Sequence, residues 1–196
     1  MRSLRLLLPL AAALALQACF GGSKPPATLL TLSPQAAPST ALVRASTAGE
    51  AVTIEVPVIG KEIRQVRVPV LEGPGRVTYV EDLQWVDTPD RLFQQLLTET
   101  VKRTTARVVF DPSQASLDPG LRVTGTLERF GYDQQSGQVL VIYDAALSTA
   151  GGGRVETRRF QATAPADGTA ATVGPAINQA ANAVALEAAR WIGGNG

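Results

Sequence analysis

Residues 1–18 constrain this chain more than any other feature, because they decide in which compartment it folds. Arg2 and Arg5 precede Leu6–Leu16, an apolar run of about a dozen residues, and a basic start followed by such a run is the pattern of a secretory signal peptide. The run is short for a membrane-spanning helix, which needs about 20 apolar residues. We therefore expect residues 1–18 to direct export and then to be removed.

The only cysteine of the chain stands where the apolar run stops, in the sequence Leu16-Gln17-Ala18-Cys19. An aliphatic residue, a variable one, a small one and a cysteine resemble the bacterial lipobox, in which the cysteine receives diacylglycerol. The alternative is an ordinary signal peptide with an unrelated cysteine nearby. Because each buried methylene contributes roughly 0.8 kcal/mol, the acyl chains of a lipoprotein hold it firmly on a membrane. We expect lipid, with palmitate among its acyl chains, on Cys19.

The residues after Cys19 indicate how the domain is held. Phe20 stands where an aspartate would retain a lipoprotein in the inner membrane of many enteric bacteria, so we expect the outer membrane, on the side that faces the periplasm. The small, polar and proline residues of Gly21–Pro26 are typical of a flexible tether, and Ala36–Thr47 is similar. We expect a signal peptide at 1–18, a lipidated N-terminus and tether at 19–48, and one domain at 49–194.

The composition argues against several classes of function. Histidine is absent and there is a single cysteine, so the commonest metal ligand and general base is missing, and no internal disulfide or cysteine-rich zinc site can form. The basic and acidic residues number 18 and 17, which gives no basic surface of the kind that nucleic acid requires. We expect a non-enzymatic domain that binds no cofactor, no metal ion and no nucleic acid.

Apolar periodicity predicts the elements of the domain. Val52–Val58 alternates like a half-buried strand, with Pro57 at an edge or an end. Thr88 and Pro89 suit the start of a helix that runs to about Thr104. The other predicted elements are strands at Thr28–Leu32, Ile63–Val70, Arg76–Val80, Arg107–Phe110 and Leu121–Phe130, a hairpin of Gln138–Thr149 with Arg154–Ala164, and a helix from Gly174-Pro175 to Gly193-Gly194. This order predicts a single α+β domain in which two helices pack on a mainly antiparallel sheet.

Few arrangements of residues suggest chemistry. Gly73-Pro74-Gly75 and Gly151-Gly152-Gly153 lack the strand, helix and Lys-Ser/Thr context of a phosphate-binding loop, so we interpret both as turns. Asp82, Asp87 and Asp90 precede and enter the first helix, but their spacing matches no calcium loop. We therefore identify no catalytic, cofactor-binding or metal-binding residue.

Trp85 and Val86, directly before the first helix, have two interpretations. A large aromatic side chain beside a loop can anchor an interface with a protein or with lipid, which makes both residues candidate partner contacts. Trp85 can instead close the hydrophobic core where strand meets helix, and this is the interpretation that we prefer. Trp191 shares a helical face with Val184 and Ala188 and is expected in the core.

Several of these segments together resemble those of the ABC-type transport auxiliary lipoproteins, partners of the MCE-type lipid transport systems of Gram-negative bacteria. The resemblance rests on the lipobox at Cys19, on Thr28–Pro34, on Val52–Val58, on Tyr79–Trp85 running into Pro89, and on the Leu92–Val101 helix. It covers most of the mature chain. The matching residues are those that form a fold, so the resemblance carries no catalytic motif.

The resemblance implies a non-enzymatic periplasmic lipoprotein. Such a protein helps an ATP-driven inner-membrane transporter and its MCE protein to move phospholipid or a related lipid between the inner and outer membranes. The implied partners are ABC transporter subunits, an MCE protein, phospholipid and the membrane itself, and assembly of several copies of the chain stays open. The alternative is a lipoprotein that regulates or scaffolds an envelope assembly such as peptidoglycan synthesis.

Overall fold

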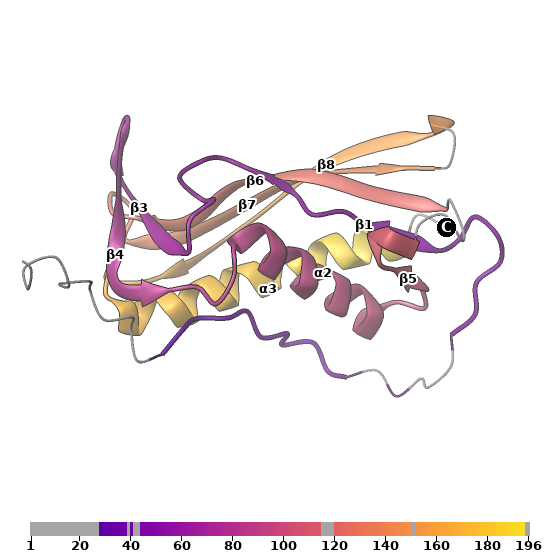
Figure 1. Cartoon of the computed structure of the whole chain (residues 1–196), viewed down its shortest axis with the longest axis horizontal. Helices are drawn as coiled ribbons and strands as arrows, with labels where there is room; N and C mark the ends of the chain where they lie inside the picture. The colour runs from indigo at the N-terminus through magenta and orange to yellow at the C-terminus, as the bar shows by residue number, and fades with distance from the viewer. Residues whose placement is uncertain (1–27, 39, 41–43, 115–119, 150–151, 195–196) are drawn as a thin grey trace, which may run out of the picture.

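The computed structural model describes residues 28–38, 40, 44–114, 120–149 and 152–194. These residues form one eight-stranded sheet, and two helices cover one of its faces while no helix covers the other (Figure 1). The predicted α+β architecture is confirmed. The predicted signal peptide and Cys19 lie outside the described residues.

The centre of the sheet is a long antiparallel meander. β6 (Leu121–Asp133) pairs with β7 (Gln138–Ser148), which pairs in turn with β8 (Val155–Pro165). The pairing of β7 with β8 confirms the predicted hairpin. Along β7, buried residues from Val139 to Leu147 alternate with half-buried ones, so every second side chain points into the core between the sheet and the helices.

Three short strands follow one another along the edge of β6 that does not pair with β7. β1 (Val52–Ile54), β2 (Val58–Ile59) and β3 (Arg67–Gly73) each pair with β6 in parallel. β5 (Val109–Phe110) pairs with β1 in parallel, and β4 (Arg76–Gln84) pairs with β3 antiparallel. The sheet is therefore mixed, although its longest ladders are antiparallel.

The prediction of one half-buried strand over Val52–Val58 is wrong. β1 ends at Ile54 and pairing resumes only at Val58, since Pro57 between them has no N–H group to donate to a ladder. β1 also lies between β5 and β6, and all three of its side chains are buried. Its position in the sheet, which depends on distant strands, overrides the alternation in the sequence.

The helix α2 (Pro89–Thr104) begins and ends where the sequence predicts. Thr88 is the N-cap residue, but its side chain makes no capping hydrogen bond. The Asp87 carboxylate accepts a hydrogen bond of 2.7 Å from the Thr88 N–H instead. The apolar side chains from Leu92 to Val101 are buried, which gives the helix one face in the core.

The helix α3 (Ala170–Gly194) begins four residues before its predicted start at Gly174-Pro175. The Asp167 carboxylate accepts hydrogen bonds from the hydroxyl of Thr172 and from the hydroxyl and N–H of Thr169. These bonds stabilise the ionised carboxylate and lower the pKa of Asp167 to about 2. They also organise the first turn of the helix, so the helix starts ahead of the proline.

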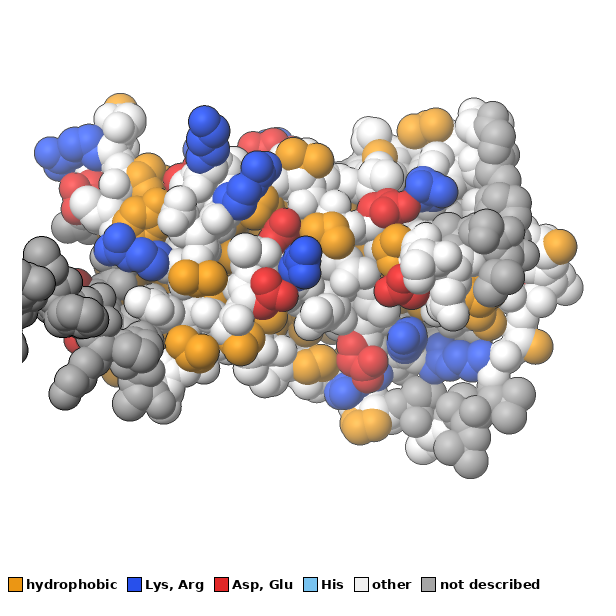
Figure 2. Space-filling model, in the orientation of Figure 1, with side chains coloured by type: hydrophobic (Ala, Val, Ile, Leu, Met, Phe, Trp, Pro, Cys, Tyr) orange, Lys and Arg blue, Asp and Glu red, His pale blue; other side chains and the backbone are white. Residues whose placement is uncertain are grey.

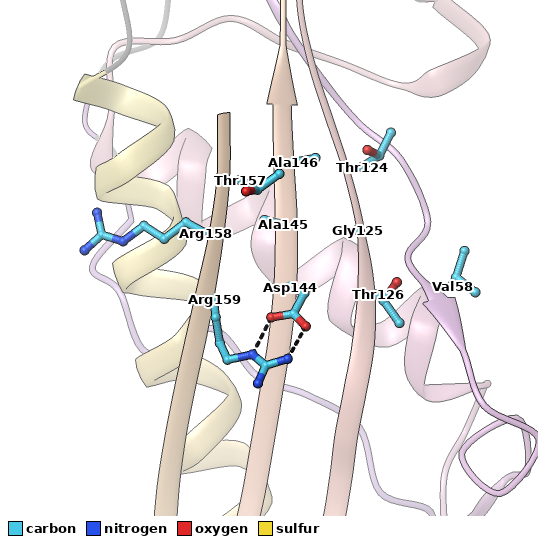
Figure 3. A pocket seen from close by; sticks show the side chains of 10 residues that line it. All are labelled: Val58, Thr124, Gly125, Thr126, Asp144, Ala145, Ala146, Thr157, Arg158 and Arg159. Atoms are coloured by element: carbon cyan, nitrogen blue, oxygen red, sulfur yellow. Dashed lines mark hydrogen bonds and ion pairs between the residues drawn. The ribbon is translucent and has the colours of Figure 1, made fainter. Parts of the chain in front are cut away.

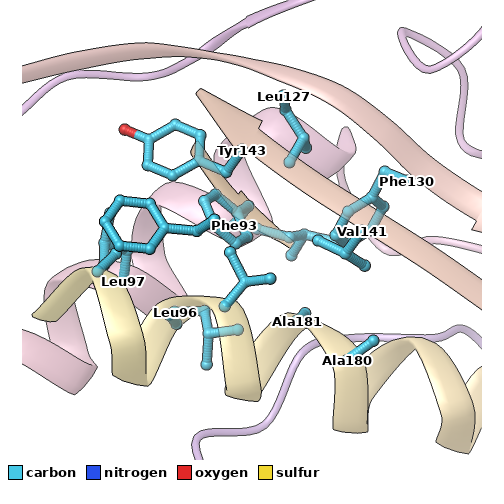
Figure 4. Close-up of a cluster of buried hydrophobic side chains, with 14 of the residues drawn as sticks. Phe93, Leu96, Leu97, Leu127, Phe130, Val141, Tyr143, Ala180 and Ala181 are labelled. Carbon is cyan, nitrogen blue, oxygen red and sulfur yellow. The ribbon is translucent and has the colours of Figure 1, made fainter. Parts of the chain in front are cut away.

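Aromatic rings join the helices to the sheet (Figure 4). Phe93 of α2 lies between Tyr143 of β7 and Phe130 of β6, with ring centroids 5.0 and 6.3 Å away. All three side chains are almost fully buried, and burial raises the pKa of Tyr143. Trp191 is only partly buried and packs 5.6 Å from the ring of Phe160, so it lies at the rim of the predicted core.

Candidate docking sites

Trp85 and Val86 lie directly after β4, at the end of the sheet where α3 begins (Figure 1). The Trp85 side chain is 2% exposed and its ring lies 5.5 Å from that of Phe130. Trp85 therefore closes the core, and a side chain buried to this extent presents no surface to a partner. Val86 is 55% exposed and remains a candidate contact.

A stretch of extended chain, Leu30–Ala36, lies along the helices on the side away from the sheet (Figure 1). We call it the docked segment. The Leu30 N–H donates to the carbonyl of Gln84 at 2.7 Å, and the Val86 N–H donates to the carbonyl of Leu30 at 2.9 Å. These bonds form one isolated parallel bridge, where the sequence predicts a short strand over Thr28–Leu32.

The side chains of the docked segment alternate between the helices and solvent. Leu30, Leu32, Pro34 and Ala36 are half-buried, and the residues between them are exposed. Leu30 and Leu32 pack against the hydrophobic core. This two-residue period is that of an extended chain lying on an apolar surface. The signal was present in the sequence, but the small and proline residues around it favoured a tether.

Two asparagines four residues apart on α3 hold the backbone of the docked segment. The Asn178 Oδ1 accepts a hydrogen bond from the Ser33 N–H at 2.8 Å, and the Asn182 Oδ1 accepts one from the Gln35 N–H at 2.7 Å. The Asn182 Nδ2 also donates to the Ser33 carbonyl at 3.0 Å. Alternate residues of an extended chain are about 6.6 Å apart and a helix rises about 6 Å over four residues, so the two spacings match.

The helix α2 holds the other end of the docked segment. The Arg103 guanidinium donates to the carbonyl of Ala36 and to the carboxylate of Glu99, each at 2.7 Å. Farther along the chain, Arg44 donates to the carbonyl of Thr105 at 2.7 Å, beyond the last residue of α2. Both helices thus contribute polar groups that fix the path of the chain before β1.

The open face of the sheet contains a shallow hollow of about 590 Å³ over β6, β7 and β8 (Figure 3). Arg159 and Asp144 form a two-pronged ion pair in it, with distances of 2.7 Å for Nε to Oδ1 and 2.6 Å for Nη2 to Oδ2. The bonds from Arg159 lower the pKa of Asp144. Thr124, Thr126 and Thr157 also line the hollow, which therefore offers hydroxyl groups beside the ion pair.

A second hollow beside it is apolar but very small. Ile63, Leu71, Phe130 and Leu140 line a space of about 10 Å³, whereas pockets that hold small molecules measure about 300–1,000 Å³. The apolar hollow is therefore too small to enclose a lipid tail. On the side of the molecule that Figure 2 shows, basic and acidic side chains are interspersed.

The acidic residues considered as a cation site do not assemble one. Asp82 lies in β4 with a φ of 54°, and the Asp87 carboxylate bonds to the backbone at the start of α2. Among the described residues, no group of three or more His, Cys, Asp or Glu side chains is arranged to hold a metal ion. Within the same residues, no helix has the length and apolar character needed to cross a membrane.

Comparison with known proteins gives one family. The family described as "ABC-type transport auxiliary lipoprotein component" matches residues 30–189. This range starts at the first residue of the docked segment and ends within α3. No curated protein matches the sequence.

Two solved structures share the fold. Protein XCC0632 from Xanthomonas campestris superposes with a TM-score of 0.71 and is 18% identical, over 85% of this chain and 95% of that one. The structure of an uncharacterized protein gives a TM-score of 0.61 at 14% identity, over 76% of this chain and 96% of that one. At such identities the likeness shows the fold alone.

Proposed function

Because this chain belongs to the family of ABC-type transport auxiliary lipoprotein components, we propose that it is a non-enzymatic accessory that serves its transporter by docking. The ATPase of the transporter supplies the energy, and the accessory supplies contacts on the periplasmic side of the membrane. The match over residues 30–189 is the observation that carries this proposal, since it includes the docked segment and most of both structural layers.

The proposed anchor is lipid on Cys19 in the outer membrane, after removal of residues 1–18. The lipobox Leu16-Gln17-Ala18-Cys19 supports it. The docked segment packs on the helices, so we count it with the folded domain and take residues 19–29 as the tether. This tether is shorter than the span of 19–48 that composition suggests.

The proposed partners are ABC transporter subunits and an MCE protein, and the proposed cargo is phospholipid or a related lipid that moves between the inner and outer membranes. The resemblance of Tyr79–Trp85 and the following helix to lipoproteins of such systems supports these partners. The open sheet face and Val86 offer the surfaces for docking. The small volume of the apolar hollow favours a path for the lipid through the partners and not through this domain.

Purification of the lipidated protein from native membranes in mild detergent tests the proposal. Mass spectrometry of the co-purifying proteins should find MCE and ABC subunits enriched with the natural protein and absent with Cys19→Ala, which cannot be lipidated. The mass of the mature N-terminal peptide should show the acyl chains on Cys19. Enrichment of peptidoglycan synthases in place of transporter subunits would assign the chain to an envelope assembly and overturn the proposal.

A further inference from the structure

The chain has two points at which it could leave the folded domain toward the membrane. One lies at Leu30, whose Cδ1 is 3.4 Å from the position that a Cβ on Gly174 would take, near the start of α3. The other lies at Arg44, which bonds to the carbonyl of Thr105 and whose neighbour Ala45 lines the same hollow as Gly193 near the end of α3. At 1.5 Å per residue, Gly174 and Gly193 are about 29 Å apart along the helix. The two points therefore mark opposite ends of the domain.

We propose that the docked segment determines which end of the domain faces the membrane. While Leu30–Ala36 is bound to the helices, the chain leaves the domain at Leu30, so the start of α3 and the β3–β4 hairpin face the lipid. If the segment is released, the chain leaves at Arg44, which bonds to the carbonyl of Thr105, and the opposite end becomes the tethered one. This inference rests on the proposed lipid anchor at Cys19, but it does not depend on the identity of the transporter.

The length of the tether supports this orientation. At no more than about 3.6 Å per residue, the chain from Cys19 to Leu30 reaches about 40 Å at most. The helix α3 has 25 residues and is therefore about 37 Å long. Turning the end of α3 toward the membrane would need a tether that is almost fully extended, which costs conformational entropy. After release, the chain from Cys19 to Arg44 reaches about 90 Å, so the restriction disappears.

The contacts of the docked segment are specific enough to hold it on the helices. Asn182 is 7% exposed, and its amide binds both the Gln35 N–H and the Ser33 carbonyl. A side-chain amide presents the same donor and acceptor pair as a peptide group, so it can form hydrogen bonds with an extended backbone as a neighbouring strand does. Asn178 and Arg103 add one bond each to this backbone.

The pairing of the strands provides two label positions at opposite ends of the domain. Arg76 starts β4, beside the end of β3, whose Leu71 pairs with Asp133 at the end of β6. Val155 starts β8 and pairs with Ser148, at the end of the sheet that contains β1 (Figure 1). Both side chains are exposed.

Energy transfer from these positions to the membrane tests the inference. Lipid occupies the sulfur of Cys19, so Arg76→Cys or Val155→Cys introduces a single free thiol for a fluorescent donor. The lipidated full chain is placed in vesicles of phosphatidylethanolamine and phosphatidylglycerol that carry an acceptor on a fraction of headgroups. We expect more transfer from position 76 than from position 155. Equal transfer, or more transfer from position 155, overturns the inference.

A pair of matched insertions separates docking from simple tether length. Twenty Gly and Ser residues inserted between Ala37 and Pro38 lengthen only the released form, so the difference between the two labels should persist. The same insertion between Ala27 and Thr28 lengthens the tether of the docked form, so the difference should shrink. An equal effect of the two insertions shows that the segment is not docked and overturns the inference.

The variant Asn178→Ala/Asn182→Ala removes the asparagine bonds to the docked segment. It should reduce or reverse the difference in energy transfer between positions 76 and 155. Far-UV circular dichroism checks that it is folded, and Ser33→Pro, which removes the N–H that Asn178 binds, serves as a second way to release the segment. Unchanged transfer in a folded release variant overturns the inference. Vesicle flotation is measured first, because a mature chain that does not float contradicts the proposed anchor itself, whereas equal transfer from floated protein contradicts the orientation alone.

Discussion

Asn182→Ala should destabilise the domain by detaching the docked segment, and more than the matched change Asn178→Ala does. Asn182 makes three hydrogen bonds, to the Gln35 N–H at 2.7 Å, to the Ser33 carbonyl at 3.0 Å and to the Asn178 carbonyl at 2.8 Å. Two of them join the docked segment to α3, and the third lies within the helix. At 7% exposure, water cannot easily replace this amide.

The expected loss follows from the number of bonds. A neutral hydrogen bond contributes about 1 kcal/mol, which gives about 3 kcal/mol for Asn182. Alanine has a better helix propensity than asparagine by roughly 0.6 kcal/mol, which offsets part of the loss. We therefore expect Asn182→Ala to lower the free energy of unfolding by about 2 kcal/mol. At about 2–4 °C per kcal/mol for a domain of this size, Tm should fall by about 4–8 °C.

Urea unfolding followed by circular dichroism measures this loss in a chain that begins at Thr28. Asn178→Ala is the matched control, because Asn178 makes only one side-chain bond to the segment and should cost less than about 1 kcal/mol. In a chain that begins at Ala37, the segment is missing and Asn182→Ala should cost almost nothing. If the cost there is as large as in the longer chain, the reasoning that assigns it to the docked segment is refuted.

Three further changes test the rest of the fold. Phe93→Ala removes a fully buried ring beside Tyr143 and Phe130 and should cost about 3–5 kcal/mol in urea unfolding, with Phe93→Leu losing less. Asp167→Asn should reduce the loss of Tm at acid pH. The pKa of Asp167 is lowered to about 2 in the folded state, so its stabilising contribution is present above about pH 4 and is lost as the pH falls toward 2. Thermal unfolding at several pH values measures this difference. Gly131→Ala places a Cβ 2.4 Å from the Pro69 carbonyl and should lower Tm by separating β3 from β6, whereas Gly153→Ala, with its closest contact at 3.8 Å, should leave Tm unchanged.

The elements that the sequence predicts best are those whose signals are local. The start of α2 follows from Thr88 and Pro89 together with the apolar period behind them, and the structure agrees to the residue. The β7–β8 hairpin follows from two alternating runs on either side of a glycine turn. The start of α3 differs from its prediction, although its signal is also local. The cap formed by Asp167, Thr169 and Thr172 places the start of the helix before Gly174-Pro175, where the sequence predicts it.

The parts that could not be predicted depend on residues far apart in the chain. Val52–Val58 looks half-buried in sequence, but β1 pairs with β5 and β6 on its two edges and all three of its side chains are buried. The docked segment has an alternating pattern, but Ser33 and Asn178 are 145 positions apart. In a helix made mostly of small residues, the sequence does not show that an asparagine binds the backbone of a distant segment. A composition typical of a tether therefore does not show whether a segment is free or bound.

The docked segment also limits where a partner can bind. It covers part of the outer side of the helices, and the inner side packs on the sheet, so the open sheet face and Val86 are the broader surfaces that remain. Two arginines on that face are already in ion pairs, Arg159 with Asp144 and Arg122 with Glu55 at 2.8 Å. Recognition there should depend on shape and hydrogen bonds more than on net charge, and the orientation set at Leu30 would decide which partners can reach it.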